Sequence, residues 1–238
     1  MRYLLVVLTH GDKATLSDTL DSFAEHVQPA ESEAAIVFDS AEQFEHDRTR
    51  LRSLAPLLRS TRGPLGFCGA TRLAWGIAAE SSRFDYVFWL EHDFVFIRPV
   101  DLREPKFVLD QNPQLAQMQF MRDATNPDEA AAGGLFESRR GQYWPHSAFF
   151  DRFKGDPGKL DTPHEMYEQA WLEHRSYLTT NPSLMRREFM ATHPWPAYPD
   201  QCEGRFGIDL AQAGFTFGVW GSGEPWVKHV GVRSGFGY

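Results

Sequence analysis

The sequence has 238 residues, of which 42% are hydrophobic and 24% charged, and its formal net charge is −8. This length allows one large α/β domain or two small ones. The acidic balance argues against a protein that coats nucleic acid through a broad basic face, because neutralising phosphates requires clustered Lys and Arg.

The apolar run within residues 1–11 is too short for a signal peptide and is not followed by a small-residue cleavage site. We therefore expect a first strand there. No apolar segment has the length of a membrane span, and we expect a cytoplasmic protein. The two cysteines, Cys68 and Cys202, are too few for a disulfide framework, so we expect reduced, buried thiols.

Strand and helix patterns alternate over the first hundred residues. A continuous apolar run at 4–8 predicts a strand buried on both faces, a second short strand is predicted at 34–38, and a third ends at Glu91. Helical spacing lies between them, at 15–23, at roughly 41–58 and at 70–79. This alternation predicts an α/β fold with a mostly parallel, doubly wound sheet flanked by helices.

The second half of the chain has a different pattern. Residues 115–121 alternate polar and apolar side chains, which predicts a strand in an exposed or antiparallel position. Residues from about 122 to 163 are rich in Gly, Asp, Asn and Pro and indicate an irregular, functional insertion. We expect helices at about 163–177 and at 203–214, and strands at 215–220 and 226–230. No linker clearly divides the chain, so we expect a single domain.

Two acids follow the third strand directly. Glu91 and Asp93 flank His92, and the apolar residues 94–97 come next. Ionised carboxylates are costly to desolvate without a partner, and Mg²⁺ or Mn²⁺ prefers such oxygen ligands. Ligands of open α/β sheets bind at the carboxyl ends of the strands. We expect Asp93 to bind a metal directly and Glu91 to bind the metal or a ribose hydroxyl; the alternative is a solvated acidic turn.

Two candidates lie late in the chain. His229, at the end of a predicted strand, can supply a further metal ligand, although a lone strand histidine is more often structural. Glu203, at the predicted start of a helix, is either a general base or an acid that favours the helix N-terminus. The residues alone leave both interpretations open.

Four further residues carry weaker signals. Asp39 follows the second strand and can bind a nucleobase or ribose, or simply occupy a turn. Arg72 opens a helix beside small residues and can contact a diphosphate, although the spacing matches neither a Walker nor a dinucleotide motif. Arg186 and Arg187 form a basic pair that can assist at the diphosphate, or lie in part on a solvated helix face.

Taken in chain order, these motifs resemble those of a GT-A glycosyltransferase. The resemblance is strongest to the large inverting family that includes many bacterial family-two enzymes. Residues 9–11 resemble the base-binding turn of that family, and 36–40 resemble its second strand with a nucleoside-binding aspartate. Residues 91–93 stand where the family has its DxD metal motif, with Glu in the first place. Residues 203–206, followed by Gly214, resemble the acidic motif of its catalytic helix, and His229 matches a late histidine.

The resemblance implies a GT-A, Rossmann-like sheet with a nucleotide-sugar-binding half over about 1–121 and an acceptor-binding and catalytic half over about 122–238. It implies sugar transfer, with inversion, from a nucleoside diphosphate sugar to a hydroxyl, with help from Mn²⁺ or Mg²⁺. The implied roles are donor contacts for Thr9, His10, Asp39, Arg72 and Glu91, metal ligation for Asp93 and His229, and general base for Glu203.

Two other functions stay open. One is a catalytically silent nucleotide- or sugar-binding module of the same fold. The other is a nucleotidyltransferase, although its Gly-rich loop after the first strand is poorly matched by residues 9–13. The acceptor is a protein, a glycan or lipid-linked sugar, or modified DNA. The aromatic residues between 143 and 150 either stack on it or cover the sheet.

Overall fold

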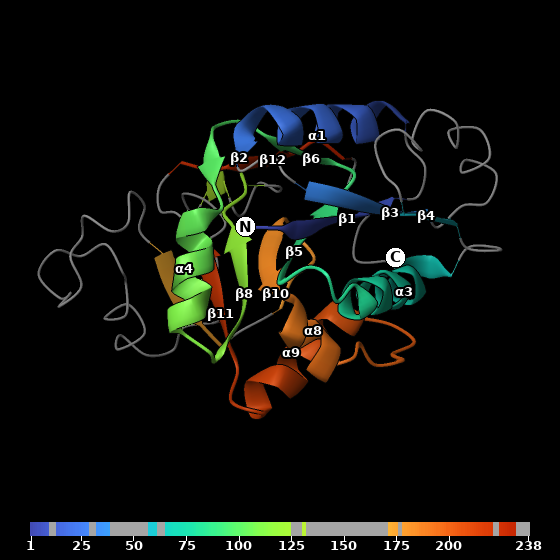
Figure 1. The fold of residues 1–238 in the computed structure, drawn as a ribbon, viewed down its shortest axis with the longest axis vertical. Helices are drawn as coiled ribbons and strands as arrows, with labels where there is room; N and C mark the ends of the chain where they lie inside the picture. Colours follow the sequence, from blue (N-terminus) through green and yellow to red (C-terminus); the bar gives the residue numbers. More distant parts are fainter. Residues whose placement is uncertain are drawn as a thin grey trace, which may run out of the picture.

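A mixed sheet of eight strands runs through the described part of the chain (Figure 1). The computed structural model describes residues 1–9, 13–28, 32–38, 57–60, 65–124, 130–131, 171–175, 178–220 and 224–231. In sheet order the strands are β4 (Leu57–Ser60), β3 (Ser32–Phe38), β1 (Tyr3–Thr9), β5 (Tyr86–Glu91), β10 (Ser183–Arg186), β8 (Leu115–Phe120), β11 (Thr216–Trp220) and β9 (Trp171–His174).

Most of these strands share one direction. β4, β3, β1 and β5 are mutually parallel, and β8 and β11 are parallel to each other. β10 lies between β5 and β8 and is antiparallel to both, so β8 and β11 point the same way as β5. Six strands therefore end at one edge of the sheet, which we call the carboxyl edge. β9 is antiparallel to β11.

Helices cover both faces of the sheet. α1 (Lys13–His26) and α4 (Arg103–Gln111) pack on one face, and α3 (Gly66–Glu80), α8 (Arg187–Thr192) and α9 (Cys202–Gln212) pack on the other (Figure 1). Two small sheets complete the described fold. One pairs β6 (Phe94–Phe96) with β12 (Val227–His229), and the other pairs β2 (Val27–Gln28) with β7 (Val100–Asp101).

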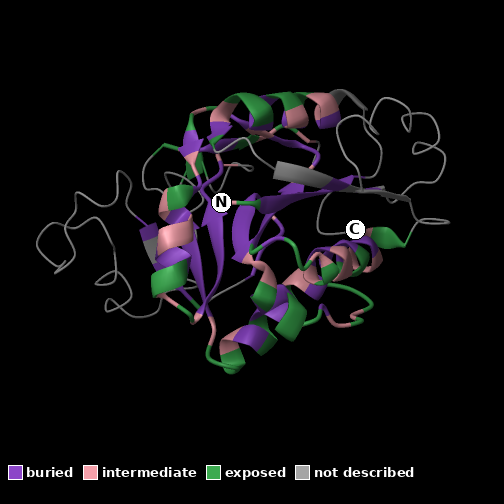
Figure 2. Ribbon diagram, in the orientation of Figure 1, coloured by how far each residue is buried: buried purple, intermediate pink, exposed green. Residues whose placement is uncertain are grey.

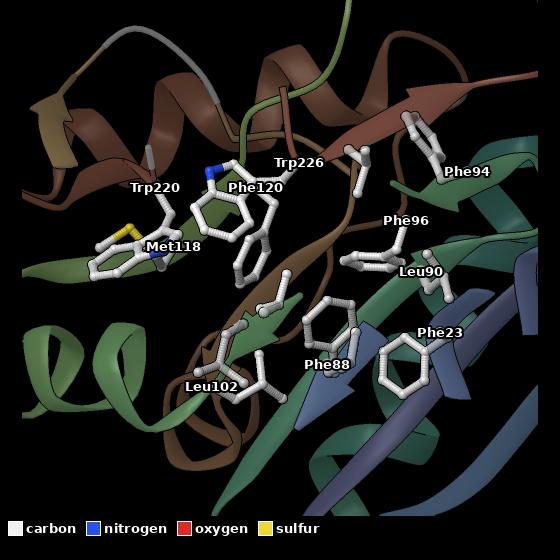
Figure 3. Close-up of a cluster of buried hydrophobic side chains, with 14 of the residues drawn as sticks. Phe23, Phe88, Leu90, Phe94, Phe96, Leu102, Met118, Phe120, Trp220 and Trp226 are labelled. Carbon is white, nitrogen blue, oxygen red and sulfur yellow. The ribbon is translucent and has the colours of Figure 1, made fainter. Parts of the chain in front are cut away.

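Aromatic side chains fill both layers of the core. On the α1 face, Phe23, Phe88, Phe96 and Phe120 meet mostly edge to face, as aromatic rings prefer (Figure 3). On the other face, Trp75 of α3 lies among other aromatic rings, and its Nε1–H donates to two backbone carbonyls at the end of α8, at 3.1 and 3.0 Å. β1, β5 and β8 are buried along almost their whole length, whereas the helices expose their outer faces (Figure 2).

The structure confirms the mostly parallel α/β sheet, and the strands expected at 4–8, 34–38, 86–91, 215–220 and 226–230 are present. The helices expected at 15–23, 70–79 and 203–214 are also present. Among the described helices, none combines the length and the apolar character that crossing a bilayer requires.

Other expectations were wrong or lie outside the described residues. Leu57 and Leu58, expected at the end of a helix, begin β4, and residues 171–174, expected in a helix, form β9. In both places, pairing with a neighbouring strand prevails over the local helical pattern. Of the two positions expected for residues 115–121, the antiparallel one is confirmed by the pairing of β8 with β10, and the exposed one is wrong, because Gln117 and Gln119 are only 1% exposed. Residues 41–56 and 132–170 lie outside the described part of the chain.

Candidate functional site

The turn after β5 is held at the carboxyl edge by its neighbours on both sides. The backbone N–H of His92 donates to the carbonyl of Leu8 at 3.1 Å, and the hydroxyl of Thr19 donates to the carbonyl of His92 at 2.6 Å. The turn then leads into β6. Its two last residues, His92 and Asp93, are each only 8% exposed. The acid that follows the central strand is therefore a buried group.

The late histidine lies directly against this acid. β12 pairs antiparallel with β6, which sets His229 opposite Phe94, and the backbone N–H of Val230 donates to the carbonyl of Asp93 at 2.8 Å. Nε2 of His229 is 3.0 Å from Oδ2 of Asp93, across 136 residues of sequence. The imidazole also packs on the ring of Phe94, with centroids 4.9 Å apart. The structure thus brings together two of the residues singled out from sequence.

A second acid, which the sequence reasoning missed, fixes the backbone beneath the histidine. Oδ1 of Asp123 accepts a hydrogen bond from the backbone N–H of His229 at 2.9 Å, and the N–H of Asp123 donates to the carbonyl of Val227 at 3.1 Å. Asp123 follows the end of β8 by three residues. An acid just beyond a strand end was the available signal, and it is the same signal that identified Asp93.

Asp93 has the electrostatic character of a cation ligand. Burial alone would raise its pKa, but the hydrogen bond from His229 and the charges of His92 and His229 outweigh burial and lower the pKa below its usual value. The carboxylate is therefore ionised near neutral pH. Its other oxygen, Oδ1, is buried and has no hydrogen-bond partner in the part of the chain that the structure describes. An unpaired oxygen on a buried carboxylate is costly unless something positive meets it.

The pair fits a divalent cation as part of its ligand set. Carboxylate oxygen suits Mg²⁺ and Mn²⁺, and imidazole nitrogen favours the transition metal of the two. The described residues do not gather three or more His, Cys, Asp or Glu side chains around one point. Two protein ligands are sufficient for a cation that takes its remaining ligands from water and substrate phosphates.

Gly231 leaves room for this carboxylate. A Cβ placed on Gly231 would lie 2.1 Å from Oδ2 of Asp93 and 2.9 Å from its Cβ and Cγ. No real side chain approaches so closely, so position 231 must be glycine if Asp93 is to keep its place beside the imidazole.

Glu203 is held at a different point of the carboxyl edge, in the first turn of α9. Its Oε1 accepts hydrogen bonds from both the backbone N–H and the hydroxyl of Thr180, the latter at 2.8 Å. Thr180 is fixed through its neighbour: the buried amide of Gln117 donates to the carbonyl of Thr179, and the N–H of Thr179 donates back to that amide at 3.1 Å. The same amide group donates to the hydroxyl of Ser183 at 2.8 Å. Gln117 of β8 thus holds the segment that binds Glu203.

The expectation of reduced thiols was wrong, because the structure joins Cys68 to Cys202 in a disulfide. The two residues are 134 apart in sequence, and their Cα atoms lie 5.7 Å apart, within the normal range for a disulfide. The bond links the first turn of α3 to the first turn of α9. A count of two cysteines contained no information on this proximity.

The other expected donor contacts are less closely placed. Thr9 ends β1 at the carboxyl edge and is buried, and Glu91 ends the adjacent β5 and is half-buried. Arg72 is exposed on α3, and no hydrogen bond or ion pair joins it to Asp93 in the described structure. His10 and Asp39 lie outside the described residues.

The basic pair lies at the wrong end of the sheet to assist at the diphosphate. Arg186 is opposite Tyr86, at the start of β5, and its guanidinium donates to the backbone carbonyls of Leu109 and Pro113. Arg187 donates to the carbonyl of Ala79 at 3.1 Å. Because β10 runs against β5, the end of β10 lies far from the carboxyl edge. These arginines instead satisfy carbonyls at the ends of α4 and α3, where cations are favoured.

No protein-family model matches the chain, and no curated protein matches it in sequence. Solved structures do match. The chain aligns with S. aureus TarS 1–349 in complex with UDP-GlcNAc at a TM-score of 0.61 and 13% identity, covering 99% of this chain and 60% of that one. It aligns with GalNAc-T7 with UDP, GalNAc and Mn²⁺ at a TM-score of 0.62 and 13% identity, covering 99% of this chain and 45% of that one.

The chain therefore spans less than two thirds of the length of these structures. Identity this low shows the fold alone. The strand order, the parallel strands that end at one edge and these two alignments lead to one conclusion: the chain has the GT-A glycosyltransferase fold.

Proposed function

We propose that this chain is a metal-assisted glycosyltransferase that moves a sugar from a nucleoside diphosphate sugar to an acceptor hydroxyl, with inversion at the anomeric carbon. The observation that carries the proposal is the buried pair of Asp93 and His229 at the carboxyl edge, with one carboxylate oxygen left unpartnered within the described residues. The edge is the ligand-binding edge of open α/β sheets. Structures of the same fold contain UDP-GlcNAc and, in GalNAc-T7, UDP, GalNAc and Mn²⁺.

In this proposal, Asp93 and His229 hold Mn²⁺ or Mg²⁺. The bound cation supplies Lewis-acid stabilisation of the charge that grows on the leaving diphosphate. Asp123 keeps His229 in place through the backbone of β12, and Gly231 leaves the space that the Asp93 carboxylate occupies. Such supporting contacts matter because they set the direction in which a ligand atom points.

The donor lies along the carboxyl edge in the same proposal. Thr9, His10 and Asp39 bind the nucleoside, Glu91 binds the ribose or the metal, and Arg72 contacts the diphosphate. Glu203 takes the proton from the acceptor hydroxyl as that oxygen attacks the sugar from the face opposite the diphosphate. Thr180 occupies Oε1 of Glu203 with two hydrogen bonds, which assigns the proton to Oε2.

Donor binding tests the metal half of the proposal. Calorimetric titration with UDP-, GDP- and dTDP-sugars, with and without Mn²⁺, identifies the donor for the wild-type chain. We expect Asp93→Asn to weaken Mn²⁺-dependent donor binding by about 100-fold, the upper range for the loss of contacts that support a metal. Asp18→Asn, an exposed acid on α1, is the matched control and should bind as the wild type does. If Asp93→Asn binds the donor as tightly as the wild type does, and still in a Mn²⁺-dependent way, the assignment of Asp93 as a metal ligand is rejected.

Turnover tests the second half. Glu203→Gln keeps the shape of the side chain but cannot accept a proton, so we expect normal donor binding and a rate of transfer lower by about 10²–10⁴-fold. A wild-type chain that binds the donor with Mn²⁺ but neither transfers nor hydrolyses the sugar would instead be a silent nucleotide-sugar-binding module.

A further inference from the structure

The two cysteines of the chain form a link between two helix starts at the carboxyl edge. Cys68 lies in the first turn of α3, and Cys202 is the first residue of α9. Both helices precede strands that run toward the carboxyl edge, β5 and β11, so their N-terminal turns lie at that edge. Cys202 directly precedes Glu203, and the disulfide is thus one residue from the proposed base.

Glu203 is therefore held from two sides. Thr180 binds its carboxylate, and the disulfide ties the backbone of the preceding residue to α3. An ion pair between Arg205 and Asp200, at 2.8 Å, also spans the start of α9, but both side chains are exposed, and exposed ion pairs add little stability. Gln201 precedes the helix in a left-handed conformation, with φ of 45°, and its side chain makes no capping hydrogen bond. The disulfide accordingly supplies much of the restraint on this turn.

The remainder of α9 is anchored independently. Phe206, one turn further on, packs edge to face on Trp75 of α3 and on Trp195, with ring centroids 5.6 and 5.0 Å apart. Opening the disulfide would therefore leave the helix packed on the core and free only the turn that holds Glu203. A displacement of about 1 Å in a reacting group can cost about 100-fold in rate.

We propose that the Cys68–Cys202 disulfide positions Glu203 and that transfer consequently depends on the oxidation state of this bond. The inference rests on the proposed role of Glu203 as base. It makes Cys68 and Cys202 positioning residues, which act through Glu203.

The redox step requires a dithiol reductant. A thiolate of the reductant attacks Sγ of the half-buried Cys68, the S–S bond breaks, and the buried Cys202 leaves as a thiolate that takes up a proton. The second thiol of the reductant then attacks the mixed disulfide and releases Cys68 as a thiol. The protein gains two electrons and two protons, and the dithiol is oxidised to a disulfide. A disulfide oxidant reverses the change.

The experiment compares the oxidised chain, the chain reduced with dithiothreitol, and Cys68→Ser/Cys202→Ser. Dithiothreitol is removed under argon before the assay, because thiols bind Mn²⁺. Thiol titration verifies the two states, and since the chain has only two cysteines the reductant has a single disulfide to open. Hydrogen exchange is followed at the amide of Arg205, which donates to the carbonyl of Gln201 at 3.0 Å in the first turn of α9.

We expect reduction to accelerate exchange at Arg205 and to lower kcat by about ten-fold, with the donor KM unchanged within about two-fold. The double serine variant should behave as the reduced chain does and should not respond to dithiothreitol. Equal exchange and equal kcat in the oxidised and reduced chains would overturn the inference.

The readouts separate this inference from the proposed function. If the oxidised chain transfers no sugar, the proposed function fails, and exchange at Arg205 alone decides whether the disulfide restrains the turn. If the double variant does not fold, the reduced wild-type chain still provides the comparison. A fall in kcat with unchanged exchange would place the effect outside α9 and overturn the positioning role.

Discussion

Substitution of Gly231 by Ala tests whether the position of the Asp93 carboxylate matters for function. The added Cβ would lie 2.1 Å from Oδ2 of Asp93, whereas ordinary contact begins at 3.4 Å, so the two groups must separate by about 1.3 Å. Rotating the carboxylate does not remove the conflict, because Cβ and Cγ of Asp93 would lie only 2.9 Å away. The shift must therefore pull Asp93 away from Nε2 of His229, now 3.0 Å distant.

If Asp93 and His229 bind the metal as proposed, a shift of this size should lower the rate of transfer by about 100-fold. Forcing a methyl group into a filled space should also reduce the free energy of unfolding by about 1–3 kcal/mol. Gly76→Ala is the matched control. Its Cβ meets nothing within 4 Å in the middle of α3, and replacing a helical Gly with Ala should stabilise the fold by about 1 kcal/mol.

Mn²⁺-dependent donor binding, the rate of transfer and urea unfolding, measured on both variants, separate function from stability. The reasoning is refuted if Gly231→Ala folds and binds the donor with the Mn²⁺ dependence of the wild type. Loss of binding in both variants would instead show that the site responds to any change in stability.

Three other predictions concern the base, the pH dependence and the core. Thr180→Val removes the hydroxyl that binds Glu203 but keeps the backbone donor, so kcat should fall about ten-fold with an unchanged donor KM. Thr180→Ser keeps the hydroxyl and should have normal kcat. A normal kcat in Thr180→Val would show that this hydrogen bond does not position Glu203. Burial lowers the pKa of His174 to about 3 from 6.5. The unfolded chain therefore takes up a proton below pH 6.5 that the folded chain does not, and stability should fall by up to about 1.4 kcal/mol per pH unit toward pH 3. Urea titrations at several pH values should show that the free energy of unfolding falls less steeply with decreasing pH in His174→Phe than in the wild type. Equal slopes in the two chains would mean that a group other than His174 takes up the proton. Trp75→Phe removes ring volume and also an N–H that donates to two backbone carbonyls. Urea titration should show a free energy of unfolding lower by about 2–4 kcal/mol. A loss under about 1 kcal/mol would mean that the core repacks.

The parts of the fold that were predicted correctly are those with a strong local pattern. β1 and β5 are continuous apolar runs, and such runs form strands buried on both faces. α3 and α9 have apolar residues at helical spacing, and α9 ends close to Gly214, whose φ of 94° suits glycine alone. The expectation for Asp93 had the same local basis: the structure gives its carboxylate a partner in His229, and the metal stays a prediction.

The parts that were missed depend on contacts between distant segments. β10 contains only four residues, and its pairing with β5 and β8 is what makes it a strand. The alternation at 115–121 left an exposed position open for Gln117, but Thr179 and Ser183 satisfy its amide inside the fold. Asp123 acts on a backbone group more than a hundred residues away, so nothing beside it in sequence indicates its partner.

The separation of Asp93 and His229 by 136 residues has a consequence for how the chain matures. Contacts between such distant segments form only after the intervening chain is in place, and they are the slowest to appear during folding. A nascent or clipped polypeptide that lacks β12 has Asp93 without His229, so the cation that we propose for this pair would not bind to it. Binding of the cation would thus require the complete fold. It would stabilise the folded chain over every partly folded form, by a free energy that grows with the logarithm of the ion concentration.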